Sequence, residues 1–526
     1  MKEINETINP IREKVKGRFQ NHFSGFLRAF LVSMLVIFQF AIIIALPFLF
    51  RSLTVYFYII LVVASVMLIF SLVNDERSMS YKMSWIYIVL VLPISGHIMY
   101  ALWGKGNSKK KLERRILNKL NHGFSYAEQD PEVLEEYRRE FPDKFRLSQY
   151  MVTEGFPLYK NNSFSYFPMG EDAFEDMFEE ISKAEKFVLV NFFIVADGAL
   201  WDHMHEILLD RIKHGVKVMF MFDDFGALFR TSNDFEKVLT KEGFEVRVFN
   251  PVHKYTDKLY MNFRSHQKIV VIDGNIGYTG GFNIADEYAN LISRFGIWKD
   301  NGIKVVGDGV WGLTVTFLQM WEVCSNGDDI DYSPYRPSVK FPESNEYCQV
   351  ISDGPANNPN NPIENVYMQM IQYASEFVYI TTPYLIIEDD MRQMLITAAK
   401  SGVDVRIICP GIPDKKNVKM MTNYNYGPLL KEGVRIYEYE PGFIHAKSII
   451  NESCGIVGTI NMDYRSFYLH YENGIFMSNS HVIEDIRQDL LKTLDECREI
   501  TYDEWCNRPW QTKVYQNMIS VFSTLM

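Results

Sequence analysis

Cysteine is sparse in this chain, and its positions exclude two kinds of structural framework. Six Cys occur among 526 residues, and none of them falls in a CxxC pair or a zinc-finger spacing. A disulfide scaffold and a structural zinc site are therefore not expected. The pattern is typical of scattered, buried thiols in a protein that works in a reducing compartment.

The chain also has no excess of basic residues. Its formal net charge is −11 and its isoelectric point is near 5.6. Proteins that bind nucleic acid usually carry a basic surface, so nucleic acid is not expected as a partner. A chain of 526 residues is too long for a single hydrophobic core, and about three structural units are expected.

Three long apolar runs lie in the N-terminal part of the chain. They cover residues 29–50, 55–73 and 85–103, and each is long enough as a helix to cross a hydrocarbon core of about 30 Å. No small-residue cleavage site follows the first run, so a signal peptide is not expected. We predict a transmembrane region over 29–103, preceded by a basic tail over 1–28.

Basic residues flank this region on both sides. The tail before it and the segment after residue 103 are both rich in Lys and Arg, and the positive-inside rule places each of them in the cytoplasm. Three full crossings cannot satisfy both placements. Either one end departs from the rule or one run lies in the membrane interface, and the sequence leaves both alternatives open.

The rest of the chain reads as a polar linker followed by a duplicated α/β domain. Residues 104–150 are polar and charged, with the pattern of short helices. Strand, helix and strand patterns then follow one another in 187–222 and again in 377–408. Because further short segments repeat in the same order, we predict two copies of one α/β domain, over 151–340 and 341–526.

A His-x-Lys pattern occurs once in each copy and is the most specific feature of the sequence. The first copy runs through His266, Lys268, Asp273 and Asn283, and the second through His445, Lys447, Glu452 and Asn461. A His and a Lys two residues apart on a strand share one face. A single His-x-Lys is a weak signal, but its duplication with the same Gly and Asn neighbours is not an ordinary strand feature.

These residue types suit the cleavage of a phosphodiester. A neutral imidazole can attack phosphorus, and an imidazolium can protonate the leaving alkoxide. Lysine ammonium and asparagine amide groups can stabilise the charge on the phosphoryl oxygens. Two histidines in opposite protonation states therefore cover the whole reaction, and neither a metal nor another cofactor is required.

With this duplicated motif the chain resembles the phospholipase D superfamily, and within it the bacterial cardiolipin synthases. Further segments carry the same resemblance: 92–96, 352–355, 382–384, 442–447, 461–467 and 505–509. The resemblance implies N-terminal transmembrane α-helices followed by two similar phospholipase D-like α/β/α domains. These domains would pack face to face around one active site.

The same resemblance implies a transfer of phosphatidyl groups in a membrane. His266 would attack one phosphatidylglycerol and release glycerol, and a second phosphatidylglycerol would take the phosphatidyl group to give cardiolipin. His445 would act first as the acid and then as the base, while the two lysines and two asparagines of the motif copies would hold the phosphate. A membrane-bound phospholipase D-type hydrolase and another phosphatidyltransferase differ mainly in the acceptor, and both remain as alternatives.

Four acidic residues around the motif copies also belong to the candidate site. Asp300 and Glu472 resemble acidic positions of the family and are candidates for orienting the histidines, as carboxylates do in triads. Asp273 and Glu452 close the two motifs and are grouped with their catalytic residues, although both look like turn residues. The family pattern has Asp at the second of these, and Glu turns less readily than Asp, so the geometry of the second hairpin stays open.

The expected partners are membrane phospholipids and the lipid bilayer itself. The thiols, the basic stretch after residue 103 and the family analogy place the catalytic domains of this multi-pass cell-membrane protein in the cytoplasm. The sequence leaves the oligomeric state open.

Overall fold

The computed structural model describes residues 23–49, 51–104, 110–232, 234–251, 263–325, 327, 329–357 and 360–523. Most of the basic tail predicted over 1–28 lies outside these residues. The chain forms two compact units. Among the described residues, the larger unit lies within 114–516, and the smaller lies within 23–113 and 517–523.

The smaller unit is built from apolar helices. They are α2 (Phe23–Leu49), α3 (Arg51–Val73), α4 (Met79–Val91), α5 (Ser95–Met99) and the π-helical segment η2 (Tyr100–Gly104). Thr54–Val73 in α3 is the one stretch within the described residues that is long and apolar enough to cross a membrane. Only 11% of this stretch is buried within the chain, so its apolar side chains are available to lipid.

The predicted spans over 29–50 and 85–103 have different outcomes. α2 covers the first, but the apolar stretch described in it, Ser33–Ala45, is shorter than a crossing, so the multi-pass topology stays a prediction. The last span is interrupted, because α4 ends at Val91, just before Pro93. Proline lacks a backbone N–H and disfavours helix at the residue before it. The prediction of one continuous span over 85–103 is therefore wrong.

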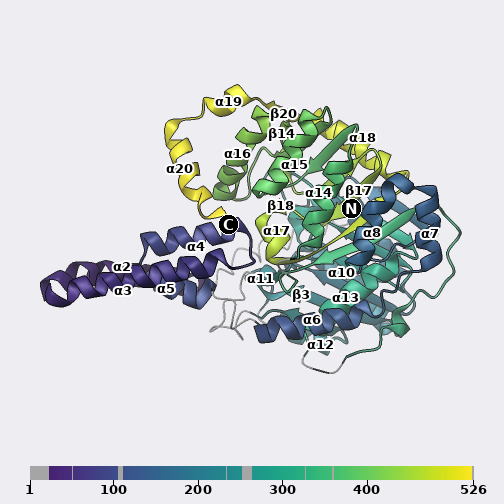
Figure 1. Cartoon of the computed structure of the whole chain (residues 1–526). Coiled ribbons are helices and arrows are strands. Elements are labelled where there is room, and N and C mark those ends of the chain that lie inside the picture. Colours follow the sequence, from purple (N-terminus) through teal and green to yellow (C-terminus); the bar gives the residue numbers. More distant parts are fainter. Residues whose placement is uncertain are drawn as a thin grey trace. The chain divides into compact units, whose positions relative to one another are not determined.

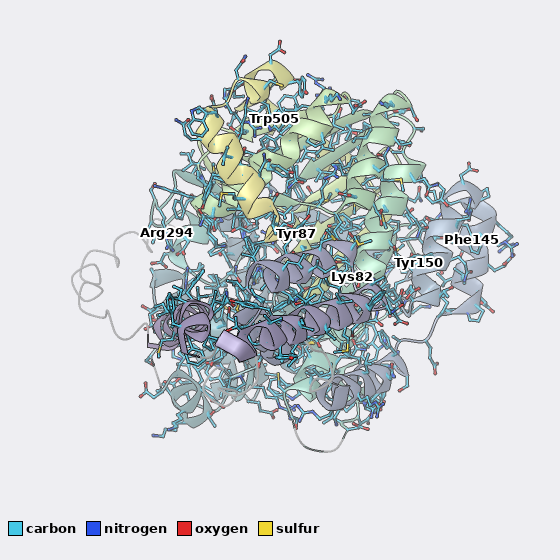
Figure 2. All side chains as sticks on the ribbon, turned by 60° about the vertical axis from the view of Figure 1, so that its left-hand side comes forward. Lys82, Tyr87, Phe145, Tyr150, Arg294 and Trp505 are labelled. Carbon is cyan, nitrogen blue, oxygen red and sulfur yellow. The ribbon has the colours of Figure 1, made fainter. Side chains whose placement is uncertain are left out.

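Polar side chains inside the smaller unit bind backbone groups. Gln39, which interrupts the first apolar run, is 1% exposed. Its Oε1 accepts hydrogen bonds from the N–H groups of Ile94 and Ser95 and from the Ser95 hydroxyl, at 3.1, 2.9 and 2.8 Å. The Ser84 hydroxyl donates to the carbonyl of Val521 at 2.7 Å and ties the C-terminal segment to α4. Tyr87 of the same helix, labelled in Figure 2, is 43% exposed.

The larger unit is an α/β structure. Its first half contains strands β1 (Asn162–Phe167), β2 (Phe187–Phe192), β3 (Lys217–Asp223), β4 (Glu245–Phe249), β6 (Ile269–Ile272), β7 (Ile276–Gly280) and β9 (Gly302–Gly307), with helices α9 (Gly170–Ser182), α10 (Ala199–Lys213), α12 (Phe235–Lys241) and α13 (Val310–Val323). Its second half contains strands β10 (Tyr347–Asp353), β11 (Phe377–Thr381), β13 (Asp404–Pro410), β14 (Arg435–Tyr439), β16 (Ser448–Asn451), β17 (Cys454–Gly458), β19 (His470–Ser478) and β20 (Cys497–Ile500), with helices α14 (Pro362–Tyr373), α15 (Asp389–Lys400), α16 (Lys416–Lys431) and α18 (Val482–Leu494). Shorter elements are α11 (Asp224–Ala227), η6 (Asp286–Ala289), η7 (Ser333–Tyr335), β12 (Leu385–Ile386), β18 (Met462–Asp463), α17 (Tyr464–Tyr468) and α19 (Tyr502–Cys506), and α20 (Trp510–Ser520) follows.

The two halves, drawn mainly in blue to teal and in green to yellow in Figure 1, have the same strand order. The first sheet runs β1-β9-β7-β6-β2-β3-β4, and the second runs β10-β19-β17-β16-β11-β13-β14-β20. The first seven strands of the second sheet therefore correspond in order to the seven strands of the first. Strands β2 and β11 are buried along their whole length, as expected for sheets covered by helices. The predicted duplication of an α/β domain is confirmed.

The segment predicted as a polar linker contributes to a hydrophobic core. It forms α6 (Lys110–Phe124), α7 (Pro131–Glu140) and α8 (Pro142–Thr153). Leu147 and Met151 of α8 are 4% and 0% exposed, and they belong to the same core cluster as Val366 and Met370 of the second half. Tyr150, labelled in Figure 2, packs against this cluster and is partly buried. The three helices are therefore part of the α/β unit rather than a mere connector.

Two short strands pass from one half to the other. β5 (Arg264–Ser265) pairs in parallel with the start of β19, with Arg264 opposite His470. β8 (Ile297–Lys299) pairs in parallel with β15 (Gly442–Ile444). Since β5 and β15 lead directly into the two His-x-Lys segments, each motif copy begins in contact with the other half. This exchange brings the two copies to one place.

Candidate active site

The two histidines lie where the exchanged strands end. His266 follows β5, and its backbone N–H donates to the carbonyl of Tyr471 at 2.8 Å. His445 follows β15, and its N–H donates to the carbonyl of Lys299 at 2.7 Å. The two residues are 7% and 6% exposed. Each histidine is thus fixed by the backbone of the opposite half.

Each imidazole faces a carboxylate from the opposite half. Nδ1 of His266 lies 2.9 Å from both carboxylate oxygens of Glu472. Nδ1 of His445 lies 2.6 Å from Oδ2 of Asp300. The sequence pointed to both carboxylates, and the structure brings each of them to the histidine of the other motif copy. With Nδ1 held in this way, Nε2 of each ring is left for a substrate.

Both carboxylates are fully buried and well supplied with hydrogen-bond donors. Glu472 accepts from the Ser466 hydroxyl at 2.8 Å and from the Thr459 hydroxyl. Asp300 accepts from the indole N–H of Trp298 at 3.4 Å and from the next backbone N–H at 3.0 Å. Burial alone would raise the pKa of each carboxyl, but the facing histidine and the other neighbours outweigh it, so the pKa of both is lowered. Both groups are therefore ionised near neutral pH.

The two motif lysines are buried beside the histidines. Nζ of Lys268 donates to the carbonyl of His266 at 2.6 Å. Nζ of Lys447 donates to the carbonyl of His445 and lies 2.8 Å from Nδ1 of the same ring. Both lysines are 1% exposed. Burial lowers the pKa of Lys268 to about 7 and the pKa of Lys447 to about 8, so their charges depend on pH in the neutral range.

Aromatic rings enclose the histidines. The ring of Phe193 lies 5.2 Å from that of His266, and the rings of Tyr288 and Trp298 each lie 5.3 Å from that of His445. Burial in these surroundings lowers the pKa of His266 to about 3 and that of His445 to about 4. Both imidazoles are therefore neutral at pH 7 in the protein without substrate.

Two asparagines that the sequence analysis missed brace the motifs. Oδ1 of Asn301 accepts from the N–H of Lys447 at 3.1 Å, and Oδ1 of Asn473 accepts from the N–H of Lys268 at 3.3 Å. Asn473 also donates to the Thr279 hydroxyl at 2.9 Å. Both bonds again join one half to the other. The available signal was that each orienting carboxylate is followed directly by Asn, in both copies of the repeat.

The two asparagines expected to hold phosphate are buried close to the motifs. Asn283 is 1% exposed, and its Oδ1 accepts from the N–H of Ile194 at 2.9 Å. Asn461 is 4% exposed, and its Oδ1 makes no hydrogen bond to any residue in the described ranges. The two positions therefore differ in their surroundings, and phosphate binding by their amide groups stays a prediction.

Asp273 closes the first motif at the end of β6 that is remote from His266. Its carboxylate accepts from the N–H groups of Glu185, Lys186 and Phe187 at 2.8, 2.8 and 2.9 Å. Its own φ is 53°, a left-handed conformation that Asp tolerates better than most residues. Asp273 was grouped with the catalytic residues because it belongs to the motif. Its contacts are those of a turn residue, and we assign it a structural role.

Glu452 holds the second motif in a related way but through a different turn. Its carboxylate accepts from the N–H and hydroxyl of Ser375, both at 2.8 Å, and from the N–H of Glu376 at 3.3 Å. The hairpin itself is closed by Asn451, whose Oδ1 accepts from the N–H groups of residues 453 and 454, each at 2.9 Å. The longer Glu side chain thus reaches the same kind of partner without a left-handed residue. It too belongs to the scaffold rather than to the reacting groups.

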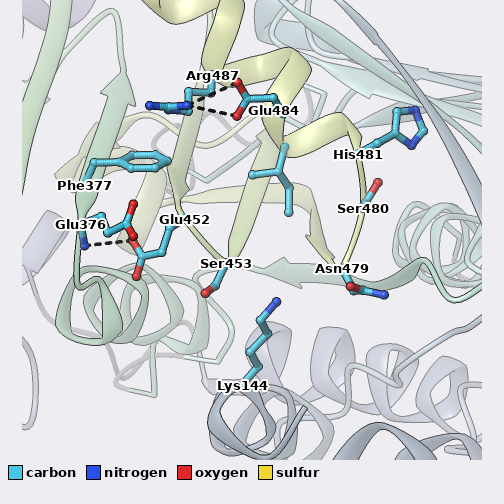
Figure 3. Close-up of a pocket in the computed structure, with 11 residues that line it drawn as sticks. Lys144, Glu376, Phe377, Glu452, Ser453, Asn479, Ser480, His481, Glu484 and Arg487 are labelled. Carbon is cyan, nitrogen blue, oxygen red and sulfur yellow. Dashed lines mark hydrogen bonds and ion pairs between the residues drawn. The ribbon is translucent and has the colours of Figure 1, made fainter. Parts of the chain in front are cut away.

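A polar cavity of about 460 Å³ lies beside this turn (Figure 3). Glu376 and Glu452 line one side of it, Lys144 reaches in from α8, His481 lies just before α18, and Arg487 lies within α18. The cavity is at the opposite end of β16 from His445 and carries charges of both signs. It is therefore separate from the histidine pair.

Comparison with known proteins identifies the family. Residues 177–293 and 367–494 match the family model described as cardiolipin synthase, PLD-like domain, and residues 59–105 match the model described as phospholipase D-nuclease N-terminal. A cardiolipin synthase of Clostridium perfringens is 32% identical over 86% of this chain and 95% of its own length. A Streptococcus mutans protein described as uncharacterized is 36% identical over 86% of this chain and 98% of its own.

A solved structure gives the same fold. Phosphatidylserine synthase of Haemophilus influenzae aligns with a TM-score of 0.56 at 14% identity, over 73% of this chain and 100% of that one. The prediction of two similar phospholipase D-like domains is thereby confirmed, and so is the resemblance drawn from the motifs. The chain belongs to the cardiolipin synthase family of phospholipase D-type phosphatidyltransferases.

Proposed function

We propose that this protein makes cardiolipin by moving a phosphatidyl group between two molecules of phosphatidylglycerol. The observation that carries the proposal is the histidine pair, in which each ring is oriented by a buried carboxylate from the other half. Two lysines lie beside the pair, as the binding of a phosphodiester anion requires.

In the first step Nε2 of His266 attacks the phosphorus of one phosphatidylglycerol. A P–N bond forms, the P–O bond to glycerol breaks, and protonated His445 gives its proton to the departing oxygen. In the second step the terminal hydroxyl of another phosphatidylglycerol gives its proton to His445 and attacks phosphorus. The P–N bond breaks, cardiolipin leaves, and both rings return to their first state.

The surrounding charges support this division of roles. Formation of the P–N bond puts positive charge on the His266 ring, and ionised Glu472 at 2.9 Å stabilises that charge. His445 needs a proton for the first step although its pKa is lowered to about 4 in the free protein. The Asp300 carboxylate at 2.6 Å and the anionic phosphodiester both favour the imidazolium form of His445. Substrate binding therefore raises the pKa of His445 and favours its protonation.

A membrane setting favours transfer over hydrolysis. The apolar stretch Thr54–Val73 anchors the chain where the acceptor lipid is concentrated. The donor bond and the product bond are both phosphodiesters, so the exchange needs no energy source, and a site enclosed by aromatic rings keeps water away. We further propose that the catalytic unit faces the cytoplasm, in keeping with its six free cysteines.

The products test the proposal. The full-length protein is placed in vesicles that contain radiolabelled phosphatidylglycerol as the only lipid with a glycerol headgroup. We expect cardiolipin and free glycerol in equal amounts, and added glycerol is expected to reverse the reaction. Formation of phosphatidic acid in place of cardiolipin would contradict the proposal and favour a hydrolase. The His266→Asn variant in the same vesicles is the control.

The pH dependence of kcat/KM is a second prediction. This parameter reports the ionisation of the free enzyme. Because the pKa of Lys268 is about 7 and that of Lys447 about 8, both ammonium charges are present at pH 6 and are lost as the pH rises to 9. We expect kcat/KM to fall at least about tenfold over this range, since uncharged lysines no longer attract the phosphodiester.

The same profile contains its own check. Lys268→Arg and Lys447→Arg keep their charge at high pH, so in each variant the alkaline fall is expected to be shallower, at a lower maximum rate because the guanidinium has a different shape. An unchanged kcat/KM between pH 6 and 9 in the native protein would mean that neither lysine contributes its charge to substrate binding.

A further inference from the structure

A third histidine lies beside the site, and the proposed reaction does not use it. His470 begins β19, and the centre of its ring is 5.5 Å from that of His266. Its Nδ1 is buried and makes no hydrogen bond within the described part of the chain. That nitrogen lies 3.6 Å from Oε1 of Glu472, just beyond hydrogen-bond distance. A buried ring nitrogen without a hydrogen bond is costly unless another group satisfies it.

The three side chains have the arrangement of a metal site. One ligand atom from each of His266, His470 and Glu472 lies within 4.8 Å of the others. Nδ1 of His266 is 2.9 Å and Nδ1 of His470 is 3.6 Å from the carboxylate. Ligands bound to tetrahedral zinc at about 2.1 Å are separated by about 3.4 Å, so small side-chain movements suffice. Two histidines, one glutamate and an open fourth position are also a common ligand set of zinc enzymes.

We propose that His266, His470 and Glu472 form an inhibitory site for a zinc-class divalent cation. The Glu472 carboxylate, which accepts hydrogen bonds from the Ser466 and Thr459 hydroxyls, supplies the negative charge. The His266 and His470 side chains are 9% and 12% exposed, whereas Glu472 is 0% exposed, so a cation reaches the site past the two rings. Magnesium and calcium, which prefer oxygen ligands throughout, are not expected to bind.

The inhibition follows from the tautomer of His266. This part of the inference rests on the proposed reaction. In that reaction Nδ1 of His266 carries the proton that faces Glu472, and Nε2 carries the lone pair that attacks phosphorus. A metal ion takes the lone pair of Nδ1, so the single proton of the neutral ring moves to Nε2. The ring keeps its charge and its proton count, but the atom aimed at phosphorus no longer has a lone pair.

A second group of possible ligands is less suited to a metal. His122, Glu322 and Asp329 also approach one another. Asp329 is already paired with Lys119 at 2.6 Å, and Glu322 accepts from the hydroxyl of Tyr332 at 3.1 Å. A metal there would have to displace these partners. This group therefore serves as a matched control for the experiment.

The test uses the full-length protein in detergent micelles after treatment with a chelator. Cobalt(II) is added alone, and the visible absorption of four-coordinate cobalt reports binding. We expect one cobalt per chain, displaced by zinc, in the native protein and in the His122→Asn and His481→Asn variants. We expect the His470→Asn variant to lose this absorption.

Inhibition by zinc is then measured against each variant's own metal-free rate. We expect half-inhibition of the native protein to need at least about tenfold less zinc than half-inhibition of His470→Asn. Equal cobalt absorption or equal zinc sensitivity in His470→Asn and the native protein would overturn the proposal. If His470→Asn fails to fold, His470→Gln, which also lacks the ring nitrogen, is measured in its place.

The cobalt signal separates this inference from the proposed function. If cobalt binds through His470 but the protein makes no cardiolipin, the metal site is supported and the proposed reaction is contradicted. If the protein makes cardiolipin but binds no cobalt at His470, the metal site is contradicted and the proposed reaction is supported.

Discussion

We expect the His266→Asn variant to make cardiolipin at least about 10³-fold more slowly than the native protein. Asparagine has no lone pair that can form a P–N bond, so the covalent route is closed and only direct transfer remains. The His445→Asn variant is expected to be impaired to a similar degree with phosphatidylglycerol, because glycerol then leaves without a proton.

A donor with a better leaving group separates the two roles. Nitrophenol leaves as a stable anion, so a phosphatidyl nitrophenyl ester needs no acid in the first step. We expect His445→Asn to release one equivalent of nitrophenol rapidly and then to stall as phosphatidyl-enzyme, since no base activates the acceptor. We expect His266→Asn to release none. The labelled lipid should stay on the His445→Asn protein after an alkaline quench, under which phosphohistidine survives.

The matched control is His214→Asn. This histidine lies at the end of α10 with 62% of its side chain exposed. Its replacement is expected to change neither the rapid release of nitrophenol nor the turnover that follows. A burst from His266→Asn, and none from His445→Asn, would reverse the two assignments. The absence of a burst and of labelled protein in all variants would exclude a covalent intermediate.

The second large effect concerns the exchanged carboxylates. We expect Glu472→Gln and Asp300→Asn each to lower the transfer rate by about 10²- to 10⁴-fold. An amide group in place of the carboxylate presents an N–H to Nδ1, which favours the proton on Nε2 and so the wrong tautomer. It also removes the negative charge that stabilises a positive ring.

The burst assay shows on which histidine each carboxylate acts. Glu472 faces His266, so Glu472→Gln is expected to lose the rapid release of nitrophenol. Asp300 faces His445, so Asp300→Asn is expected to keep the burst and to turn over slowly. The opposite result would mean that each carboxylate serves the histidine of its own half. Glu499→Gln, a surface ion-pair variant with Arg435 as partner, is the control, and thermal unfolding of each protein checks that the fold is kept.

The sequence was sufficient for the features that depend on local pattern and on repetition. The apolar run of α3, the duplicated α/β domain and the residues of both His-x-Lys copies could all be predicted, because side-chain periodicity and repeated spacing are written along the chain. The break before Pro93 was also within reach, since proline ends helices for a local reason. The apolar length of the run favours a membrane span more strongly than its single proline argues against one.

Tertiary structure alone decided which carboxylate serves which histidine. Asp300 and His445 are 145 residues apart, and Glu472 and His266 are 206 residues apart. Both contacts depend on β5 and β15 crossing to the other half, and no local pattern encodes such a crossing. The same holds for Asn301, Asn473 and His470, which are ordinary polar residues until the fold brings them to the site. The sequence thus determined which chemical groups are available. The exchange of strands between the two similar halves decided how these groups are assembled, because hydrogen bonds form between neighbours in space whatever their separation along the chain.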